Sequence, residues 1–208
     1  MSDQKKMVKA YVRGRLIQWQ RQSNEHLVRA DLANLRRGIG KKPGEMPELW
    51  GLLFRDFPEE LMSKTGEPTW AEWAVYGALT NYALHRQGTS RNVYAEGQRL
   101  GMAIRKLAGP DNDEESMKAV QRRFNAFATA RDMPECMYHL RGLVRLLHSE
   151  DIPLDYVDLA GDLYEFQTPG GAARVRLRWG QDFYRISFRD EDNDNDEYRK
   201  DDDTCENE

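Results

Sequence analysis

Apolar residues recur three or four positions apart along most of this 208-residue chain, which is the spacing that places them on one face of an α-helix. Ser23 and Thr69 stand before two of these segments and are expected to be N-caps. Glycine and proline separate the segments, as at Pro58 and at residues 109–110. The pattern predicts eight helices, over residues 5–22, 24–37, 47–57, 70–87, 100–107, 114–131, 135–148 and 154–166.

Residues 172–183 leave two alternatives open. Val175, Leu177 and Trp179 alternate as in a strand, whereas Val175, Trp179 and Phe183 follow helical spacing. The helices predicted elsewhere favour a helix here, and no alternation of strands with helices indicates a parallel sheet. We therefore expect an all-α fold, a single-domain helical bundle of about eight to nine helices within residues 1–189.

Charge divides the chain into two parts. Residues 190–208 hold eleven acidic and two basic residues, a net charge of −9. The whole chain has 31 basic and 35 acidic residues, so residues 1–189 keep 29 and 24, a net charge of +5. A segment with almost no apolar residues cannot offset the entropy lost on ordering, so we expect a disordered acidic C-terminal tail beside a basic body.

Composition narrows the class of protein. With 39% hydrophobic and 32% charged residues, the chain can bury a sizeable core and still cover its helices with solvated faces. No apolar run approaches the ~20 residues that span a bilayer, and the N-terminus has no apolar stretch long enough for a secretory signal. We therefore expect a cytoplasmic protein without a membrane partner, in which Cys136 and Cys205 are free thiols.

Four cations surround a glycine-rich loop after the second predicted helix. Arg36 and Arg37 end the helix, and Lys41 and Lys42 follow within the loop, where glycine lets the backbone approach an anion closely. A Walker-type phosphate loop needs glycine five positions before its Gly-Lys pair and Ser or Thr after it, but Leu35 and Lys42 stand there. Mononucleotide binding is therefore disfavoured. Composition supports contact with a nucleic-acid backbone and a plain solvated loop about equally.

Further cations lie in the second half of the chain, and arginine dominates them. Guanidinium binds phosphate through two hydrogen bonds and stacks on bases, although charged helical faces are common and most nearby Tyr and Trp residues fit the core. The residues of this second set are Arg122, Arg123, Arg141, Arg145, His148, Arg174, Arg176 and Arg178.

Catalytic patterns are sparse. Cys136 and His139 have zinc-like spacing but no second ligand pair follows, so a cysteine of the core is favoured. The four histidines form no HExxH motif, and the acidic residues at 111–115 suit a helix start. We predict no catalytic residue, no metal site and no cofactor.

Four stretches together carry a resemblance to a known family. They are LANLRRGIGKKPGEMPELW, WAEWAVYGALTNYALHRQG, RRFNAFATARDMPECMYHLRGLVRLL and LYEFQTPGGAARVRLRWGQDFYR. In these the chain resembles the CasB family, the small subunit of the type I-E CRISPR surveillance complex Cascade. The resemblance covers most of residues 10–187 and leaves out the acidic tail.

The resemblance implies an all-helical, non-enzymatic protein. Members sit as two head-to-tail copies beside the large subunit and the backbone subunits, where they brace the duplex of crRNA and target DNA and hold the displaced single strand. The residues that match the family's basic positions are Arg36, Arg37, Arg123, Arg131, Arg141 and Arg174. Lys41, Lys42 and Arg91 extend this set by extrapolation, and Arg122, Arg145 and Arg176 join it from the residue pattern.

Two other hypotheses remain open. One is a purely structural subunit whose basic faces contact protein partners. The other is a nuclease, which would need carboxylates brought together in space. No sequence feature favours the nuclease.

Overall fold

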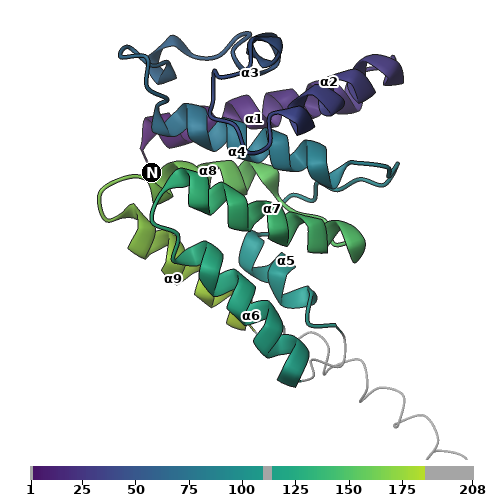
Figure 1. Ribbon diagram of the computed structural model, residues 1–208, viewed down its shortest axis with the longest axis vertical. Coiled ribbons are helices and arrows are strands. Elements are labelled where there is room, and N and C mark those ends of the chain that lie inside the picture. The colour runs from purple at the N-terminus through teal and green to yellow at the C-terminus, as the bar shows by residue number, and fades with distance from the viewer. Residues whose placement is uncertain (1, 110–113, 186–208) are drawn as a thin grey trace, which may run out of the picture.

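The computed structural model describes residues 2–109 and 114–185. Within them the chain forms nine α-helices, two short 3₁₀ helices and no strand (Figure 1), which confirms the predicted all-α fold. The acidic tail over residues 190–208 lies outside the described residues, so its disorder stays a prediction. The α-helices are α1 (Asp3–Arg21), α2 (Glu25–Arg37), α3 (Trp50–Leu53), α4 (Trp70–His85), α5 (Leu100–Lys106), α6 (Glu114–Ala128), α7 (Met133–Ser149), α8 (Tyr156–Phe166) and α9 (Gly171–Tyr184), and the 3₁₀ helices are η1 (Pro47–Leu49) and η2 (Glu59–Leu61).

α4 is the central helix. All of its residues except Trp70 and Trp73 are buried, because it packs between α1 and α2 on one side and α7 and α8 on the other (Figure 1). Its start is capped as predicted: the Thr69 hydroxyl accepts from the backbone N–H of Glu72 at 3.1 Å, and the Glu72 carboxylate accepts from the N–H of Thr69 at 2.7 Å. This reciprocal pair satisfies two backbone donors that the helix leaves open.

α9 settles the choice between helix and strand at residues 172–183. Val175, Trp179 and Phe183 are buried, whereas Leu177 is 64% exposed. A strand would have put Leu177 on the buried side with Val175 and Trp179, so the structure confirms the favoured helix. The Trp179 ring lies 4.8 Å from that of Phe127, which joins α9 to α6.

An ion network holds α1, α8 and α9 together. Lys5 of α1 donates to Glu165 of α8 at 2.6 Å. Arg178 of α9 donates to Asp162 at 2.6 Å and to Glu165 at 2.8 Å. The indole N–H of Trp179 donates to the other Asp162 oxygen at 2.7 Å. Buried charges are tolerated because each has an opposite charge and hydrogen bonds.

The start of α2 differs from the prediction. Ser23 does not cap the helix. Instead the Asn24 side chain accepts from the N–H groups of His26 and Leu27, at 3.1 and 3.4 Å. Asn24 holds the residue position directly before the first helical residue, where such a side chain reaches the free N–H groups.

The helix predicted over residues 47–57 is shorter and ends at Leu53. Asp56 has a φ of 59°, a left-handed conformation that cannot continue a helix. The Tyr11 hydroxyl of α1 donates to the Leu53 carbonyl at 2.8 Å and so satisfies part of the helix end. Phe57 still reaches the core, 5.0 Å from the Tyr11 ring.

Candidate nucleic-acid interface

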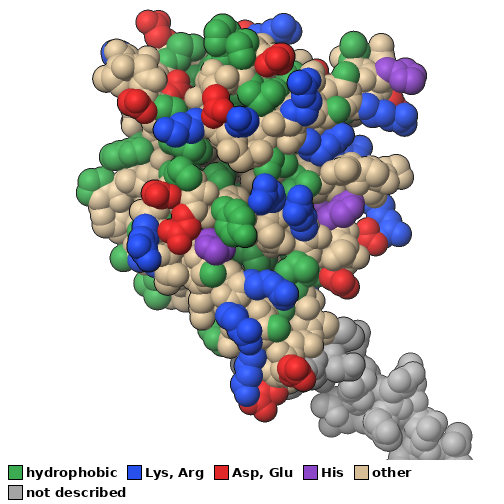
Figure 2. Space-filling view, viewed as in Figure 1, with side chains coloured by type: hydrophobic (Ala, Val, Ile, Leu, Met, Phe, Trp, Pro, Cys, Tyr) green, Lys and Arg blue, Asp and Glu red, His purple; other side chains and the backbone are tan. Residues whose placement is uncertain are grey.

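Cationic side chains gather over α6 and over the middle of α7 on one side of the molecule, as Figure 2 shows. We define the basic face by five arginines of α6, α7 and their connection. These are Arg122, Arg123, Arg131, Arg141 and Arg145.

α6 presents two of these arginines because its other side is buried. Val120, Phe124 and Phe127 pack inward, which leaves Arg122 and Arg123 exposed. Neither guanidinium has a hydrogen-bond or ion-pair partner within residues 2–109 and 114–185. Unpaired guanidinium groups keep their full capacity to bind an anion.

α7 supplies the next pair. Arg145 is exposed and unpaired among the described residues. The Arg141 guanidinium lies 5.5 Å from the ring centroid of Tyr138, over its ring. Arg131 precedes the helix with an exposed side chain, and its backbone N–H donates to Glu135 at 2.8 Å.

The two arginines at the end of α2 differ, because the side chain of one is hydrogen-bonded within the described fold and that of the other is not. Arg36 is half-buried and donates to the Ala83 carbonyl of α4 at 3.2 Å. Arg37 is exposed, with no partner in the described part of the chain.

Gly38 serves packing rather than anion approach. Its carbonyl accepts a hydrogen bond from the Tyr76 hydroxyl, and an added Cβ would lie 2.6 Å from the Leu49 side chain. Packing therefore explains Gly38, and the expectation that the glycines of this loop let an anion approach the backbone stays a prediction.

The two lysines of the same loop also differ. Lys41 pairs with Glu45 at 2.9 Å. The Lys42 side chain is exposed and unpaired among the described residues, while its backbone N–H donates to Glu45 at 3.0 Å. These contacts, the Lys42 N–H first, lower the pKa of Glu45, so the carboxylate neutralises part of the loop's charge.

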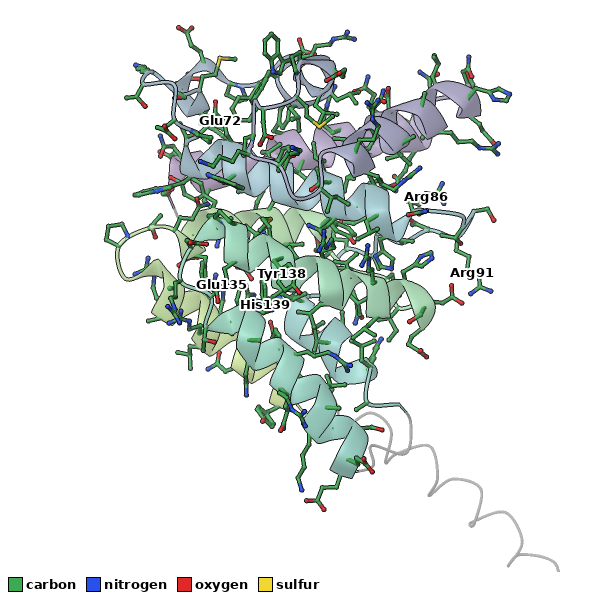
Figure 3. All side chains as sticks on the ribbon, in the orientation of Figure 1. Glu72, Arg86, Arg91, Glu135, Tyr138 and His139 are labelled. Atoms are coloured by element: carbon green, nitrogen blue, oxygen red, sulfur yellow. The ribbon has the colours of Figure 1, made fainter. Side chains whose placement is uncertain are left out.

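Three other predicted positions are engaged within the fold. Arg91 pairs with Asp151, and Figure 3 shows Arg91 at the edge of the molecule, apart from Tyr138 on α7. Arg176 donates to the Ala128 carbonyl at 2.6 Å. Arg174 of α9 pairs with Glu165 of α8 at 2.9 Å.

Glu165 is the acceptor for several cations. Burial opposes its ionisation, but hydrogen bonds from Lys5, Arg178 and Arg174 lower its pKa to about 2. Arg174 therefore lies beside a carboxylate that is ionised at neutral pH. The charge of Arg174 is therefore neutralised by Glu165, whereas, among the described residues, the arginines of the basic face have no such carboxylate as an ion-pair partner.

His148 does not extend the basic face. Its Nδ1 lies 2.9 Å from the His85 carbonyl oxygen. His85 in turn is buried against the Tyr156 hydroxyl at 2.9 Å, and burial, followed by the charge of His148, lowers its pKa to about 4. These groups join α4, α7 and α8 rather than facing a ligand.

Cys136 is a core cysteine, as the spacing argument favoured. It is buried, and burial raises the pKa of its thiol to about 12. Nowhere in the described ranges do three His, Cys, Asp or Glu side chains gather so that they could hold a metal ion. A search of the same ranges finds no helix with the length and apolar character needed to cross a membrane.

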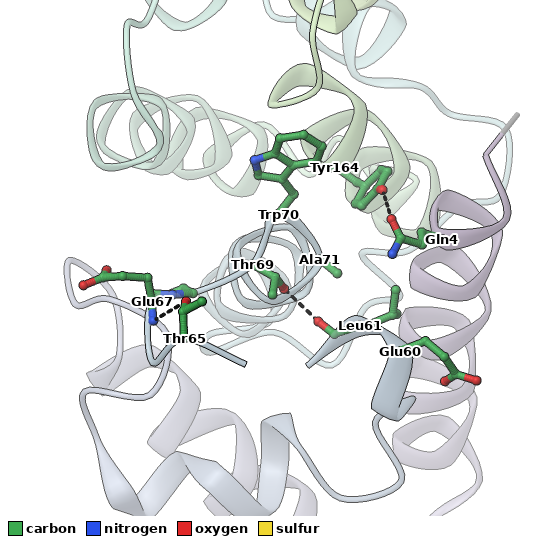
Figure 4. A pocket seen from close by; sticks show the side chains of 10 residues that line it. Gln4, Glu60, Leu61, Thr65, Glu67, Thr69, Trp70, Ala71 and Tyr164 are labelled. Atoms are coloured by element: carbon green, nitrogen blue, oxygen red, sulfur yellow. Dashed lines mark hydrogen bonds between the residues drawn. The ribbon is translucent and has the colours of Figure 1, made fainter. Parts of the chain in front are cut away.

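A cavity of about 350 Å³ lies where α1, α4 and α8 meet. Figure 4 shows Trp70 and Tyr164 at its wall, with the Tyr164 hydroxyl donating to Gln4 at 2.6 Å. No lysine or arginine lines it, so it is separate from the basic face.

Comparison with known proteins places this arrangement in a family. The family model for the CRISPR-associated protein Cse2 matches residues 31–184. The chain belongs to the Cse2 family of CRISPR-associated proteins. This confirms the resemblance to CasB.

Solved structures agree with the family assignment. CasB from Thermobifida fusca is 32% identical, with a TM-score of 0.70 over 89% of this chain and 99% of that one. A Cse2-family protein from Thermus thermophilus (23% identity, TM-score 0.60, 88% and 99% covered) and M. ruber CasB (23%, 0.60, 92% and 98%) share the fold. The comparison with curated proteins returned no match.

One exposed residue beside the basic face was not singled out from the sequence. Tyr138 was not named among the candidate residues, yet it is 65% exposed. The signal was present in the spacing, because Tyr138 falls off the buried stripe of Cys136, Leu140 and Leu143.

Proposed function

We propose that this chain is the non-catalytic small subunit of a type I-E CRISPR surveillance complex and acts in the cytoplasm. In this role it contacts the large subunit, the backbone subunits and a second copy of itself. Its basic face, with Arg37 and Lys42, braces the duplex of crRNA and target DNA and holds the displaced strand.

The observation that carries this proposal is the set of exposed arginines without acidic partners on α6 and α7. Residues 1–189 hold 24 acidic and 29 basic residues, so their carboxylates could pair with most of their cations. The buried side of α8 uses its carboxylates on other cations, since Glu165 pairs with Lys5, Arg174 and Arg178. Cations left unpaired suit a surface that tracks phosphates whatever the base sequence, since in such complexes the guide supplies specificity by base pairing.

Affinity of the isolated subunit is expected to be modest. Residues 1–189 carry only +5, and the remaining residues carry −9. In an assembly, several subunits that hold the same strand gain from effective concentration, so weak individual contacts suffice.

A matched pair of variants tests the proposal in the assembled complex. Arg122→Gln with Arg123→Gln removes two unpaired charges. Arg13→Gln with Arg29→Gln removes two exposed charges that are paired with Glu96 and Glu25. We expect only the first variant to weaken target DNA binding and to reduce the slope of log affinity against log salt by about 0.7 for each lost contact with a single strand. Equal affinities of both variants in intact complexes would refute the proposal.

A structural subunit remains the second candidate function, favoured by exposed apolar side chains such as Leu177, Trp50 and Leu27, which are 64%, 52% and 54% exposed. In that case the arginines of the basic face pair with acidic surfaces of neighbouring subunits. The same first variant would then reduce incorporation into the complex, while complexes that do form would bind DNA normally.

A further inference from the structure

α7 carries an aromatic side chain that packing does not explain. Tyr138 is 65% exposed, whereas Cys136 and Leu140 on either side of it are buried. Its hydroxyl has no hydrogen-bond partner among the described residues. Figure 3 shows Tyr138 in the middle of the molecule's face on α7, with His139 beside it, and the two ring centroids are 5.3 Å apart.

Two arginines follow Tyr138 along the same side of the helix. Arg141 is three residues on, with its guanidinium 5.5 Å from the ring centroid. Arg145 is a further four residues on, exposed and unpaired within the described ranges. Positions three and four apart share a helical face, and Arg145 lies about 10 Å along the axis from Tyr138. An aromatic ring beside cations is the arrangement that binds unpaired bases and their phosphates.

Gly142 lies within this group, and the fold does not require a glycine there. A Cβ added at Gly142 would meet no atom within 4 Å. At Gly77 of α4, by contrast, the added Cβ would lie 2.6 Å from the sulfur of Met137. Glycine inside a helix destabilises it relative to other residues. The missing side chain at Gly142 leaves open space between Tyr138 and Arg145, where a ligand can approach the helix.

We propose that Tyr138, Arg141, Gly142 and Arg145 form a stacking site for an unpaired nucleotide. This inference rests on the proposed function and refines it, because it assigns this part of the basic face to a single strand rather than to a duplex. Bases in a duplex are already stacked and offer no free ring face, whereas every unpaired base does. The shared chemistry is that of single-stranded DNA or RNA.

The test uses the full-length protein at low salt with three labelled probes. These are an oligothymidylate, an oligouridylate and an abasic oligodeoxynucleotide of the same length, which keeps the phosphates and lacks the bases. Tyr138→Ala should weaken binding of a base-containing probe about tenfold, the effect of losing one base–aromatic stack, and leave the abasic probe unchanged. Tyr138→Phe should bind like the original protein. If Tyr138→Ala weakens binding of the oligothymidylate, the site is assigned to DNA. If it weakens binding of the oligouridylate, the site is assigned to RNA.

Arg145→Glu separates the failure of this inference from failure of the proposed function. It should weaken all three probes, because it removes a phosphate contact. A second outcome is that Tyr138→Ala leaves the binding of every probe unchanged or weakens all three equally, while Arg145→Glu weakens the binding of all three. In that case the stacking site is overturned and the proposed function stands. If the protein binds no probe even at low salt, both are overturned for the free subunit.

A glycine variant gives a readout that a structural role would not produce. Gly142→Gln should raise the thermal midpoint, because glutamine favours the helix, and should weaken oligothymidylate binding several-fold by filling the open space. Gly14→Gln on α1 is the matched control, since an added Cβ there also meets no atom within 4 Å. It should raise the midpoint and leave binding unchanged. Unchanged binding in Gly142→Gln would contradict the proposed site.

Discussion

The basic face of α6 and α7 and the surface between α8 and α9 use arginine in opposite ways. On the basic face, Arg122, Arg123 and Arg145 have no partner among the described residues. Between α8 and α9, Arg174 and Arg178 donate to Glu165, at 2.9 and 2.8 Å. Both regions contain arginines at similar density next to apolar residues in the sequence.

The difference comes from the neighbouring helix. α8 directs Asp162 and Glu165 toward α9, so the arginines of α9 hold the fold together. In α7, Glu135 instead accepts from the backbone N–H of Arg131 at 2.8 Å, and no described carboxylate faces Arg145. Arginine content therefore indicates an anionic partner only after the carboxylates packed beside each arginine are known.

The largest loss of stability is expected when the ion pairs between α8 and α9 are broken. Asp162→Ala leaves the buried Trp179 indole without its acceptor and Arg178 with Glu165 alone, so the free energy of unfolding should fall by about 3 kcal/mol. Asp158→Ala on the same helix is the control, because its pair with Lys9 is 26% exposed on both sides and should cost under about 1 kcal/mol. Urea denaturation measures both. Equal losses would mean that the buried network does not hold the fold.

Arg36 and Arg37 of α2 allow a structural arginine and a free arginine to be compared at adjacent positions. Arg37→Glu should weaken target DNA binding by the complex about five- to tenfold at low salt, with unchanged stability. Arg36→Glu should lower the free energy of unfolding by about 1 kcal/mol, because it loses the bond to the Ala83 carbonyl at the end of α4. Filter binding and urea denaturation of each variant decide this. Unchanged DNA affinity of an intact Arg37→Glu complex would remove this loop from the interface.

The stability that the ion pairs between α8 and α9 provide should also depend on pH. Glu165 has a pKa of about 2 in the fold against an ordinary value of 4.5, so its contribution is present above pH 4.5 and is lost as the pH falls toward 2. Because the carboxylate is partly solvated, we expect about 1 kcal/mol rather than the full value of the shift. Asp162 responds in the opposite sense, since burial raises its pKa.

The comparison is therefore made between the original protein and Glu165→Gln, by thermal unfolding at several values of pH. The original protein should be the more stable of the two above pH 5, and the gap should close at low pH. A gap that does not depend on pH would contradict the assigned pKa.

The smallest effect concerns the acidic residues beyond the described fold. Deleting residues 190–208 changes the net charge from −4 to +5. Binding of single-stranded DNA by the free basic face should tighten about threefold at low salt, and the gain should disappear near physiological salt through screening. Replacing the acidic residues by serine and glycine at equal length controls for the loss of chain. Identical affinities at low salt would show that the tail does not affect the basic face.

Helical spacing predicted most of the elements, since burial of one stripe per helix is a local property. The prediction was least accurate at the ends of helices, as at Ser23 and residues 54–57. There a single capping side chain or one residue in a left-handed conformation decides where the helix begins or ends. Residues 172–183 were ambiguous for a physical reason: Val175 and Trp179 lie on one face in either structure, and only the packing of α9 decided that Leu177 is exposed.

By itself the sequence determined the all-α class and the list of candidate cations, because each follows from residue types and their spacing along the chain. It also carried the family, through four stretches that resemble CasB. Only the tertiary structure decided which cations are free. The carboxylates that neutralise Arg174 and Arg178 lie on α8, and the carbonyl that holds Arg36 lies on α4. Spacing along one helix carries no information about the residues that another helix places beside it.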